Sequence, residues 1–482
     1  MTRPTMPNEY PEGSLEEAPP AADPELVGAF VAADIEVDVS QRARAEHGRD
    51  WWPITIADVA AGRVPHWPGV VVRPRTTDQV SRALRIASAW GVAVTAQGGR
   101  SGVEGGAVAP DGAIALDLTG LNRVLDVDEI SGTVRVEAGV FGPDLEAAVR
   151  DRGLTVGHFP QSFELSTVGG WLASRGAGQY SNRYGSVEDM VRGLTVVLAS
   201  GDVVALGGRA PREAVGPDLT QLFVGSEGTL GIITEATLAL HRLAPHEQRA
   251  AFGFASFADG LEACRRVFQR GARPAVLRLY DEAESTRHFG VSSCALIVLD
   301  EGDAALVSST MGIVVEECRT AARLDDDHVA TWLEHRNDVS ALAPLWEHGV
   351  CVDTIEVAGP WRALESMCRD VTDALRGVEG TVVASVHQSH AYLDGACLYF
   401  TFAGRPEGDP TAYYRRAWDV ATEAALRGGG TLSHHHGVGR NRARFVRGAL
   451  ASAWPVLEAV KRALDPHGLL NPGALGLGGV PW

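Results

Sequence analysis

Cysteine is scarce in this chain of 482 residues, and its distribution is uneven. All six cysteines lie in the C-terminal half, and no two have the CxxC spacing of zinc or dithiol sites. Their scatter also lacks the pattern of a disulfide framework in a secreted protein. We therefore expect reduced, buried thiols, and no metal held by cysteine, at Cys264, Cys294, Cys318, Cys351, Cys368 and Cys397.

Long apolar runs and an excess of positive charge are also missing. No apolar run approaches the roughly 20 residues that a membrane-spanning helix needs, so stable membrane insertion is not expected. The net charge of -18 argues against nucleic acid as a partner and favours a cytoplasmic protein. A small molecule is the expected partner, and a homodimer is an open alternative.

The first residues, Met1 to about Asp23, lack the basic and apolar regions of a signal peptide. They are rich in Pro, Glu and Ala, a composition that predicts a disordered lead-in over residues 1–23. Residues 24–64 follow with the pattern of a helical segment.

The rest of the chain divides by its rhythm of apolar residues and turns. Residues 65–245 alternate short β-branched strands, such as Val70–Val72, with glycine turns and helix-like stretches, such as Thr77–Ala89. Residues 246–430 show a second helix–strand rhythm, and residues 431–482 contain adjacent histidines and a further helix. These patterns predict an α+β fold with more than one domain.

Two glycine-rich loops belong to the first of these sections. Gln97–Gly106 (QGGRSGVEGG) follows the strand Val92–Thr95, and its glycines allow positive φ angles and close backbone approach. Successive amides in such a loop can bind a diphosphate. The loop is not the GxGxxG that opens a helix in Rossmann folds. Taken alone, this loop and the second one, Gly225–Ile233, are each also compatible with a plain turn.

Residues 157–189 are the most informative stretch. The run from Gly157 to Trp171 (GHFPQSFELSTVGGW) is dense in small and hydroxyl residues, with neither helical nor strand periodicity. Its backbone is therefore specified for something other than a core. Amides and hydroxyls presented in this way suit a phosphate or the edge of a heteroaromatic ring.

In their order and spacing these loops, with the strand Val72–Val80, resemble the FAD-binding domain of the vanillyl-alcohol oxidase / p-cresol methylhydroxylase (PCMH) superfamily. Thr155–Trp171 is most similar to alkyldihydroxyacetonephosphate synthase and its bacterial FAD-linked oxidase relatives. The resemblance covers about residues 65–480. It implies a PCMH-type FAD-binding domain of two subdomains (65–245), a C-terminal α+β cap domain (246–430) and a segment that returns to the active site (431–482).

The resemblance also places the FAD contacts. Some members of the superfamily tether FAD through a histidine in the first loop. This chain has neither His nor Cys in Arg100–Glu104, so noncovalent FAD is expected. The residues implied to bind FAD are Ala96, Gln97, Gly98, Gly99, Arg100, Ser101, Gly102, Gln161, Ser162, Phe163, Glu164, Leu165, Ser166, Thr167, Ala173, Ser174, Arg175, Gly176, Glu227, Gly228, Thr229, Leu230, Gly231, Ile232 and Ile233.

A histidine triplet and a tyrosine are the candidate catalytic groups. In Leu432–Arg440 (LSHHHGVGR), three adjacent histidines cannot all face the same way on a strand, so we expect one or two to point at the active site. A metal tract or a solvated loop is the alternative, but no Cys or carboxylate stands at ligand spacing, and no metal is expected. In the family this segment lies over the flavin, which implies catalytic roles for His434, His435 and His436. Tyr399 matches the family's catalytic tyrosine, with a core strand aromatic as the alternative.

Further candidates come from charged and imidazole side chains. Arg278 lies among apolar residues, where an ion pair is the plain interpretation. The resemblance favours a role for it near the flavin or an anionic substrate. His158, inside the signature, and His387 and His390, before the tyrosine strand, are candidate substrate contacts, with a structural histidine as the alternative for each.

One departure from the family pattern concerns substrate binding. In the synthases, an arginine on a helix before the motif that resembles Val352–Ala358 binds the anionic substrate. Here the aligned position falls near residues 342–343, and Pro344 is expected to interrupt the helix. Arg336 is the candidate replacement, one or two turns earlier.

These features predict an FAD-dependent oxidoreductase acting on a small, anionic hydroxy substrate. Tyr399 or a histidine of the triplet would remove a proton, and hydride would pass to flavin N5, with Arg278 or a histidine holding the carbonyl product. Tyrosine, whose ordinary pKa is about 10, would need a cationic neighbour to act as a base. One alternative is alkyldihydroxyacetonephosphate synthase activity, which forms an ether bond without net redox change and loses support with the family arginine. The second alternative is a non-catalytic flavin-binding homologue.

Overall fold

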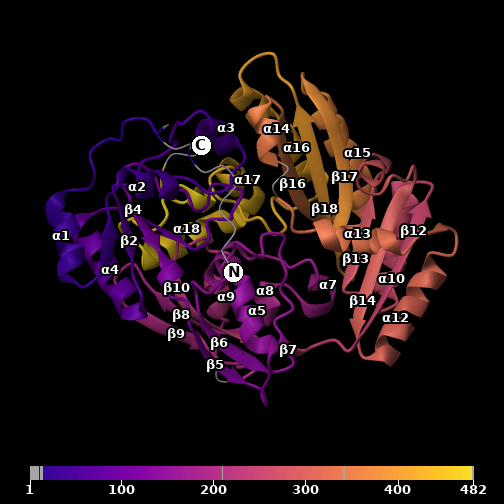
Figure 1. Ribbon diagram of the computed structural model, residues 1–482, viewed down its shortest axis with the longest axis horizontal. Coiled ribbons are helices and arrows are strands. Elements are labelled where there is room, and N and C mark those ends of the chain that lie inside the picture. Colours follow the sequence, from indigo (N-terminus) through magenta and orange to yellow (C-terminus); the bar gives the residue numbers. More distant parts are fainter. Residues whose placement is uncertain (1–9, 11–12, 14, 209, 340–341, 480–482) are drawn as a thin grey trace.

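The computed structural model describes residues 10, 13, 15–208, 210–339 and 342–479. Figure 1 shows two lobes side by side: an N-terminal lobe of indigo to magenta elements and a cap of pink to orange elements. The yellow C-terminal elements return from the cap to the N-terminal lobe. Residues far apart in the sequence therefore meet where the two lobes join.

The first sheet of the N-terminal lobe is mostly parallel, with only its β1–β2 pair antiparallel. Its strands, in spatial order, are β1 (Glu36–Asp38), β2 (Val70–Arg73), β4 (Ile114–Asp117) and β3 (Val94–Gln97). α1 (Pro24–Ala32) and α4 (Thr77–Trp90) pack on it through Phe30 and Leu84. α4 begins where Thr76 accepts from the amide of Gln79, and it ends at Gly91 in the left-handed conformation.

The second sheet of this lobe is antiparallel. Its strands, in spatial order, are β5 (Val124–Asp128), β6 (Thr133–Glu137), β10 (Ile232–Ala239), β8 (Val191–Val197) and β9 (Val203–Gly207). α6 (Val168–Ser174) packs against β10 and β6. The other elements of the lobe are α2 (Gln41–His47), α3 (Ile54–Ala60), η1 (Leu118–Gly120), α5 (Gly142–Arg150), β7 (Leu154–Thr155), α7 (Ser181–Tyr184), α8 (Val187–Met190), α9 (Thr220–Phe223) and β11 (His241–Arg242).

The cap is one antiparallel sheet with helices packed on it. Its strands, in spatial order, are β15 (Ala322–Leu324), β12 (His246–Phe254), β14 (Cys294–Gly302), β13 (Val276–Tyr280), β17 (Thr381–Ala391), β18 (Gly395–Gly404) and β16 (Cys351–Pro360). Its helices are α10 (Phe257–Gln269), α11 (Glu282–Phe289), α12 (Ala304–Glu317), α13 (Asp327–His335), α14 (Leu342–Glu347), α15 (Trp361–Arg376) and α16 (Pro410–Arg427).

The two faces of the cap sheet differ in polarity because side chains alternate along each strand. On β18, Leu398, Phe400 and Phe402 are buried in a core that α15 and α16 cover. Tyr399 and Thr401 lie between them and belong to the opposite face. The strand register aligns this face into three rows across β16, β18 and β17: Glu356–Tyr399–His387, Thr354–Thr401–Ser385 and Val352–Ala403–Val383.

The C-terminal segment, residues 431–479, closes back onto the N-terminal lobe. Its helices are α17 (Ala443–Leu450), η2 (Ala451–Ala453), α18 (Trp454–Leu464) and η3 (Ala474–Gly476). Leu470 forms a parallel bridge with Val94 of β3. Lys461, the only lysine in the sequence, is buried in α18 and donates to the carbonyls of Thr229 and Leu470 and to Asp465. One side chain thus joins α18 to the second glycine-rich loop.

The start of the described chain differs from the expected disordered lead-in. Residues 1–9, 11, 12 and 14 lie outside the described residues, but residues 15–23 are held on the N-terminal lobe. Buried Arg44 donates to the carbonyls of Pro19 and Pro20, and the amide of Ala22 donates to Gly69. Composition alone does not reveal this docking, because its hydrogen bonds run from a folded lobe to an extended segment.

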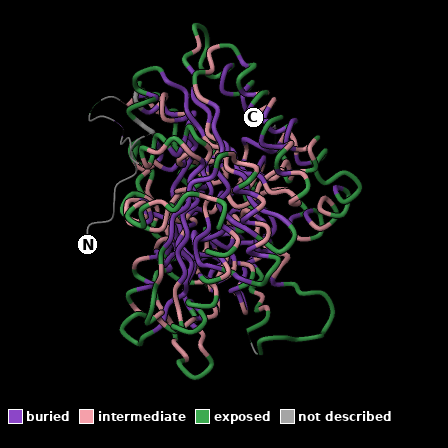
Figure 2. The backbone as a smooth tube through the Cα atoms, turned by 90° about the vertical axis from the view of Figure 1, so that its right-hand side faces the viewer, coloured by how far each residue is buried: buried purple, intermediate pink, exposed green. Residues whose placement is uncertain are grey.

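Two expectations about the whole chain have structural counterparts. All six cysteines are buried and unpaired, which confirms the expected thiols. Among the described residues, no helix is both long and apolar enough to cross a membrane. Figure 2 shows buried backbone through the middle of the molecule and exposed backbone mainly at the peripheral loops.

Candidate active site

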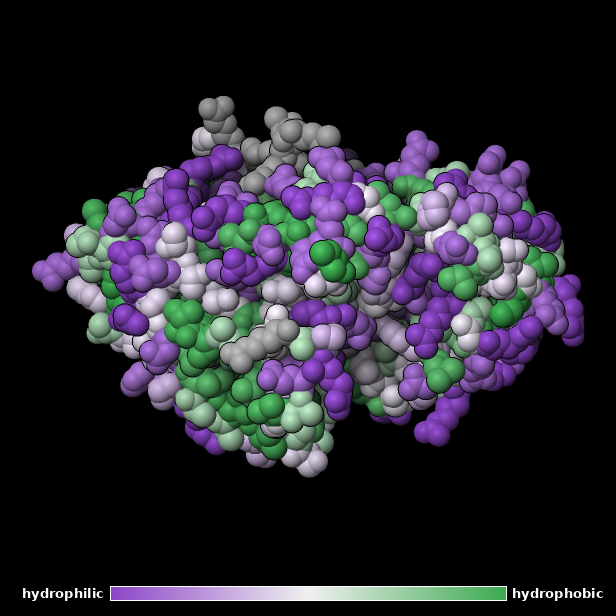
Figure 3. Space-filling view, turned by 90° about the horizontal axis from the view of Figure 1, so that it is seen from below, coloured by the Kyte–Doolittle hydropathy of each residue, from purple (hydrophilic) through white to green (hydrophobic). Residues whose placement is uncertain are grey.

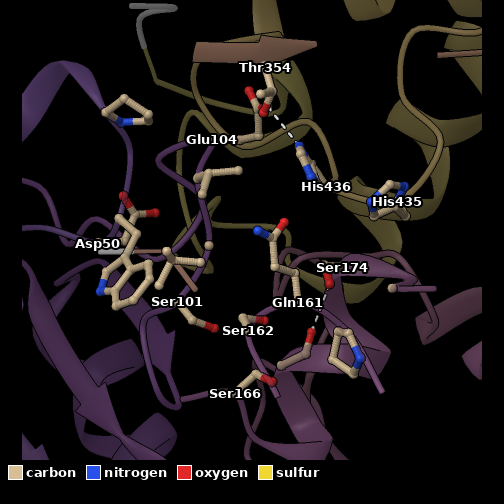
Figure 4. Close-up of a pocket in the computed structure, with 18 of the residues that line it drawn as sticks. Asp50, Ser101, Glu104, Gln161, Ser162, Ser166, Ser174, Thr354, His435 and His436 are labelled. Carbon is tan, nitrogen blue, oxygen red and sulfur yellow. Dashed lines mark hydrogen bonds and ion pairs between the residues drawn. The ribbon is translucent and has the colours of Figure 1, made fainter. Parts of the chain in front are cut away.

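A cavity of about 1160 Å³ is lined by residues of the N-terminal lobe, the cap and the C-terminal segment. Figure 4 shows Ser101, Gln161 and His436 around its open centre. Seen from below, the surface is hollowed between the lobes (Figure 3). Pockets for one small molecule hold roughly 300–1,000 Å³, so this cavity has room for a large cofactor together with a substrate.

The loop after β3 forms a backbone cradle on one wall. A Cβ on Gly98 would overlap Oγ1 of Thr167, and one on Gly99 would overlap the carbonyl of Leu165, so this close approach requires glycine. Within the described part of the chain, the amides of Gly98, Gly99 and Ser101 donate to no backbone carbonyl. Unpaired amides along a cavity wall suit the oxygens of a diphosphate.

Arg100 adds positive charge to this cradle. It holds a left-handed φ of 54°, and its guanidinium lies 3.1 Å from both ring nitrogens of His47. Burial, with Arg100 beside it, lowers the pKa of His47 to about 3, so this imidazole is neutral. Arg100 therefore brings a positive charge to this wall of the cavity, in a protein of strongly negative net charge.

Most residues that the resemblance assigns to FAD do line the cavity. They come from the loop after β3, from the polar run before α6, from α6 itself and from the second glycine-rich loop. They are Ala96, Gln97, Gly98, Gly99, Arg100, Ser101, Gly102, Gln161, Ser162, Ser166, Thr167, Ala173, Ser174, Gly176, Glu227, Gly228, Gly231, Ile232 and Ile233.

Six of the assigned residues do not line the cavity, for two physical reasons. Phe163, Leu165, Thr229 and Leu230 pack into the protein: the Phe163 ring stacks on Trp171, and the Thr229 hydroxyl donates to the carbonyl of Ser226. Glu164 and Arg175 lie at the surface, where Arg175 pairs with Glu188 at 3.2 Å. In a continuous loop, alternate side chains turn away from the ligand, so a matched segment overstates the contacts.

His158 is a buried side chain that lacks a partner. It is fully buried and lines the cavity, yet neither ring nitrogen has a hydrogen-bond partner among the described residues. Burial lowers the pKa of His158 to about 3, so the neutral ring offers one donor and one acceptor. Buried polar groups are rarely left unpaired. Together with the amide cradle, this ring fits a cofactor that has both a diphosphate and a heteroaromatic edge.

Tyr399 of the cap and His436 of the C-terminal segment form a hydrogen-bonded pair. Oη of Tyr399 lies 3.2 Å from Nε2 of His436 and accepts from Oγ1 of Thr354 at 3.1 Å. Burial raises the pKa of Tyr399 above its ordinary value, and burial lowers the pKa of His436. The phenol therefore keeps its proton and donates it to Nε2, which leaves the ring hydrogen of His436 on Nδ1.

Two carboxyl groups and an arginine stand behind His436. Nδ1 of His436 lies 4.0 Å from Glu104 and 3.8 Å from Glu356, and fully buried Arg442 donates to both carboxyl groups. Burial raises the pKa of Glu104 well above its ordinary value. Burial also acts upward on Glu356, but Arg442 and His436 outweigh it and hold the pKa of Glu356 well below its ordinary value. Glu356 is thus the anionic partner of His436.

Glu356 also shapes the histidine triplet. Its Oε1 accepts the amides of His434, His435 and His436 at 3.1, 2.9 and 2.7 Å. Three successive amides that converge on one oxygen require a looped backbone, so the expected strand alternation does not apply. His435 and His436 line the cavity. His434 is turned away from it and lies 2.6 Å from the hydroxyl of Tyr392.

His390 reaches the cavity because β17 has an irregular register between Gln388 and Ala391. Its Nδ1 lies 2.6 Å from the hydroxyl of Ser181, and its ring stacks on His434 at 4.8 Å. One ring nitrogen each of His390, His434 and His435 lies within 4.8 Å of the others. The expectation of no metal stays a prediction at this histidine cluster.

Two arginines flank Trp332 in the cap part of the cavity. Their Cζ atoms lie 5.5 Å (Arg278) and 5.7 Å (Arg336) from the Trp332 ring. Arg278 donates to Oη of Tyr280, and Arg336 donates to Gln179. Neither guanidinium forms an ion pair with a carboxylate of the described residues, so the ion pair suggested for Arg278 is not found.

Arg336 lies just after α13, which ends at His335. α14 begins at Leu342, so the helical break comes before Pro344 and is not caused by it. Proline is accommodated here in the first turn of a new helix. The side chains of residues 342 and 343 lie outside the described residues, whereas Arg336 lines the cavity.

Sequence reasoning missed part of the wall. Asp50, between α2 and α3, lines the cavity, accepts two backbone amides, and has its pKa raised to about 7 by burial. Glu284 and Trp332 of the cap also line it. Glu356 offered a usable signal, because it is a lone charge between Ile355 and Val357 on a strand. Asp50 and Trp332 offered none, since acids in turns and aromatics in helices are common in any fold.

The backbone cradle and the unpaired buried imidazole of His158 define a protein that binds a large cofactor with a diphosphate and a heteroaromatic edge. Residues 68–207 match the FAD binding domain family, and residues 243–475 match the C-terminal domain of FAD linked oxidases. The uncharacterized FAD-linked oxidoreductase YgcU of Escherichia coli (strain K12) is 31% identical over 431 residues, covering 85% of this chain and 89% of that protein. The chain belongs to the FAD-linked oxidase family, and its cofactor is FAD.

Two solved structures show the same architecture. A structure of alkyldihydroxyacetonephosphate synthase is 26% identical and superposes with a TM-score of 0.80, covering 98% of this chain and 89% of that one. A structure of p-cresol methylhydroxylase with substrate bound is 18% identical, with a TM-score of 0.76 over 94% of this chain and 96% of that one, and it shares the fold. The expected family, fold class and cofactor are confirmed.

Proposed function

We propose that this protein is an FAD-dependent oxidoreductase that oxidises the CH–OH group of a small, anionic hydroxy substrate. The observation that carries the proposal is that the Tyr399–His436 pair lies in the same cavity as Arg278, which forms no ion pair with a carboxylate of the described residues. FAD, when bound, supplies the acceptor for the hydride. The loop Arg100–Glu104 offers no His or Cys for a tether, which supports noncovalent binding.

The proposed cofactor contacts follow from the cradle. The amides of residues 98–102 and the guanidinium of Arg100 are expected to hold the diphosphate. The neutral ring of His158 is expected to meet a polar edge of the ring system or of the substrate, because it has both a donor and an acceptor to satisfy.

The proposed proton path runs from the substrate through Tyr399 to His436. The substrate hydroxyl gives its proton to the phenol oxygen while the phenol proton moves to Nε2 of His436. The resulting imidazolium lies 3.8 Å from anionic Glu356, which stabilises it. Arg278 and Arg336 bind the anionic group and orient the carbon for hydride loss. Histidine is therefore the base in this scheme, and tyrosine is the relay.

The alternative activity is that of alkyldihydroxyacetonephosphate synthase, which the structural likeness favours. The candidate anion-binding arginine here follows α13, whereas the family's arginine belongs to the position near residues 342–343. This change of element argues for a substrate held differently from that of the synthase. A non-catalytic homologue is disfavoured by the retained phenol–imidazole pair.

Anaerobic mixing of the purified holoenzyme with candidate substrates separates these functions. The panel contains short 2-hydroxy acids, matched neutral alcohols, and a fatty alcohol with an acylated, phosphorylated ketone. We expect a 2-hydroxy acid to bleach the oxidised-flavin absorbance and yield the keto acid, while the matched alcohol does neither. Ether formation without net bleaching would favour the synthase, and no response to any compound would favour the non-catalytic homologue.

A further inference from the structure

A buried carboxylate that the proposed reaction does not use lies against the cavity face of the cap sheet. Glu284, in the first turn of α11, is 1% exposed. Its Oε1 accepts from the hydroxyls of Ser385 at 3.0 Å and Thr401 at 2.9 Å, which are a cross-strand pair. Its Oε2 lies 2.7 Å from Nδ1 of His387. Such a group is costly to bury. Its hydroxyl and imidazole partners come from β17 and β18, the strands nearest the reacting pair, and Arg287 of α11 pairs with Oε1 at 3.2 Å.

The charge of Glu284 fixes the tautomer of His387. Burial would raise the pKa of Glu284, but the donors around it, with His387 foremost, lower it to about 2, so the group accepts hydrogen bonds only. Burial lowers the pKa of His387, whose ring is therefore neutral. The single ring hydrogen must then lie on Nδ1, facing Glu284, and Nε2 carries a lone pair.

That lone pair is occupied by Arg278. One guanidinium nitrogen of Arg278 lies 2.8 Å from Nε2 of His387, and Nε donates to Oη of Tyr280 at 3.1 Å. A guanidinium has five N–H donors, so these two contacts leave donors for a ligand. Glu284, His387 and Arg278 thus form one hydrogen-bonded series of side chains, and its last member, Arg278, lines the cavity.

A comparison with Arg442 shows how the contact through His387 differs from a direct ion pair. Arg442 is fully buried and contacts Glu104 and Glu356 directly, so its charge is balanced by carboxyl groups inside the protein. In the series that ends at Arg278 an imidazole separates the guanidinium from the carboxylate. The geometry of Arg278 is thereby fixed while its charge stays available to an anion.

We infer that Glu284 is a positioning residue that acts through His387 to hold Arg278 for the anionic group of the substrate. The inference deepens the proposed function and rests on it. It assigns to His387 an orienting role instead of proton transfer or direct substrate contact. The His387 ring stacks on Tyr399 with the ring centroids 4.8 Å apart, so the same contact also orients the imidazole.

The first test needs no substrate. In holoenzyme labelled with ¹⁵N-histidine, the His387 signals are identified by their loss in His387→Gln. We expect the Nδ1–H tautomer near neutral pH in the wild type, and loss of that preference in Glu284→Gln. An Nε2–H tautomer or an imidazolium in the wild type would overturn the inference, as would a tautomer that Glu284→Gln leaves unchanged.

The second test uses oxalate, a dianion that cannot lose hydride, titrated against the flavin absorbance. Glu284→Gln and His387→Gln should each weaken oxalate binding about tenfold, the lower end for losing a group that orients a ligand contact, with FAD content unchanged. The control Ser385→Ala removes a hydrogen bond to the same carboxylate but leaves its His387 side intact, and it should bind oxalate as the wild type does.

The outcomes separate the inference from the proposed function. If Arg278→Gln binds oxalate normally, or the wild type does not bind it, the anion-binding part of the proposed function fails, and the tautomer alone decides the role of Glu284. If Arg278→Gln weakens binding while Glu284→Gln and His387→Gln do not, only the positioning role fails. A loss in Ser385→Ala equal to that in Glu284→Gln would instead indicate a general packing effect and overturn the inference.

Discussion

Burial sets the proton positions of the individual residues around the cavity. The phenol of Tyr399 and the imidazoles of His158, His387 and His436 are all pushed toward their neutral forms, because charge is poorly solvated there. A neutral imidazole can accept a proton, whereas a neutral phenol can only pass one on. In the proposed mechanism, this difference makes His436 the base and Tyr399 the relay, without any appeal to a phenolate.

The relay role of Tyr399 predicts the effect of Tyr399→Phe. Removing the hydroxyl breaks the path to His436, so the rate of flavin reduction by substrate should fall about 10²–10⁴-fold, the usual worth of positioned acid–base catalysis. Stopped-flow absorbance measures this rate, and the FAD content should be unchanged. Tyr413 is a matched control, since it is buried and its hydroxyl lies 2.9 Å from that of Thr381, away from the cavity. A near-normal rate in Tyr399→Phe would remove the tyrosine from the mechanism.

The assignment of His436 as base predicts a pH profile. Burial lowers the pKa of His436 in the folded protein. At a pH equal to the ordinary histidine pKa, about 6.5, the ring is therefore mostly neutral. The rate of flavin reduction should therefore be level from about pH 7 upward, and should fall only as the pH drops through the lowered pKa. Stopped-flow rates across this range test it. A rate that keeps climbing toward alkaline pH would instead indicate that Tyr399 must ionise.

At the scale of elements, sequence patterns predicted the positions of helices and strands well. They predicted poorly how these elements pair and which side chains face the cavity. The helix expected at Thr77–Ala89 is α4, which ends one residue later at Trp90, because its Thr76 cap and the Gly91 that ends it are local signals. The irregular register that turns His390 toward the cavity depends on how β17 pairs with β18, which is a non-local choice. The FAD loops were found as segments, yet which side chains face the ligand followed only from the folded backbone.

The contact between the second glycine-rich loop and the C-terminal segment gives a prediction about stability. Glu227 accepts the amides of Val438 and Gly439 from the C-terminal segment at 2.6 and 2.8 Å, and burial raises its pKa to about 7. Because the folded pKa lies above the ordinary value, its stabilising contribution is complete below about pH 4.3 and is lost as the pH rises through 7. Glu227→Gln should lack this loss.

The measurement is the difference in melting temperature between Glu227→Gln and the wild type, taken from pH 5 to pH 8. As the pH rises over this range, the variant should become more stable relative to the wild type. The change corresponds to roughly 3 kcal/mol of unfolding free energy at most. Exposed Glu164, changed to Gln, is the control and should show no such trend. Parallel curves for wild type and Glu227→Gln would contradict the assigned pKa.

At the scale of the whole molecule, one buried arginine links all three parts of the chain. Arg442 of the C-terminal segment contacts Glu104 of the N-terminal lobe and Glu356 of the cap. These partners are 338 and 86 residues away in the sequence. No local pattern reports a contact at such separation, so the sequence could not predict how the lobes are joined, even though each lobe was expected.

Arg442→Met tests this link. It leaves the Glu356 carboxylate buried without its cation, which typically costs about 3–5 kcal/mol, so calorimetry should show a lower melting temperature. Arg447→Met, at an exposed position of α17, the helix that follows Arg442, should melt as the wild type does. Adding Glu356→Gln to Arg442→Met should recover part of the loss, because it removes the stranded charge. Unchanged melting of Arg442→Met would show that the triad does not join the lobes.

The burial of Lys461 has a practical consequence for chemistry done on the protein. No other residue of the sequence is lysine, and the Lys461 ammonium donates hydrogen bonds to Thr229, Asp465 and Leu470. The folded molecule therefore presents no lysine side chain to acylating labels, amine cross-linkers or acetylating agents. Modification located at Lys461 by peptide mapping would therefore report the opening of the C-terminal segment away from the second glycine-rich loop.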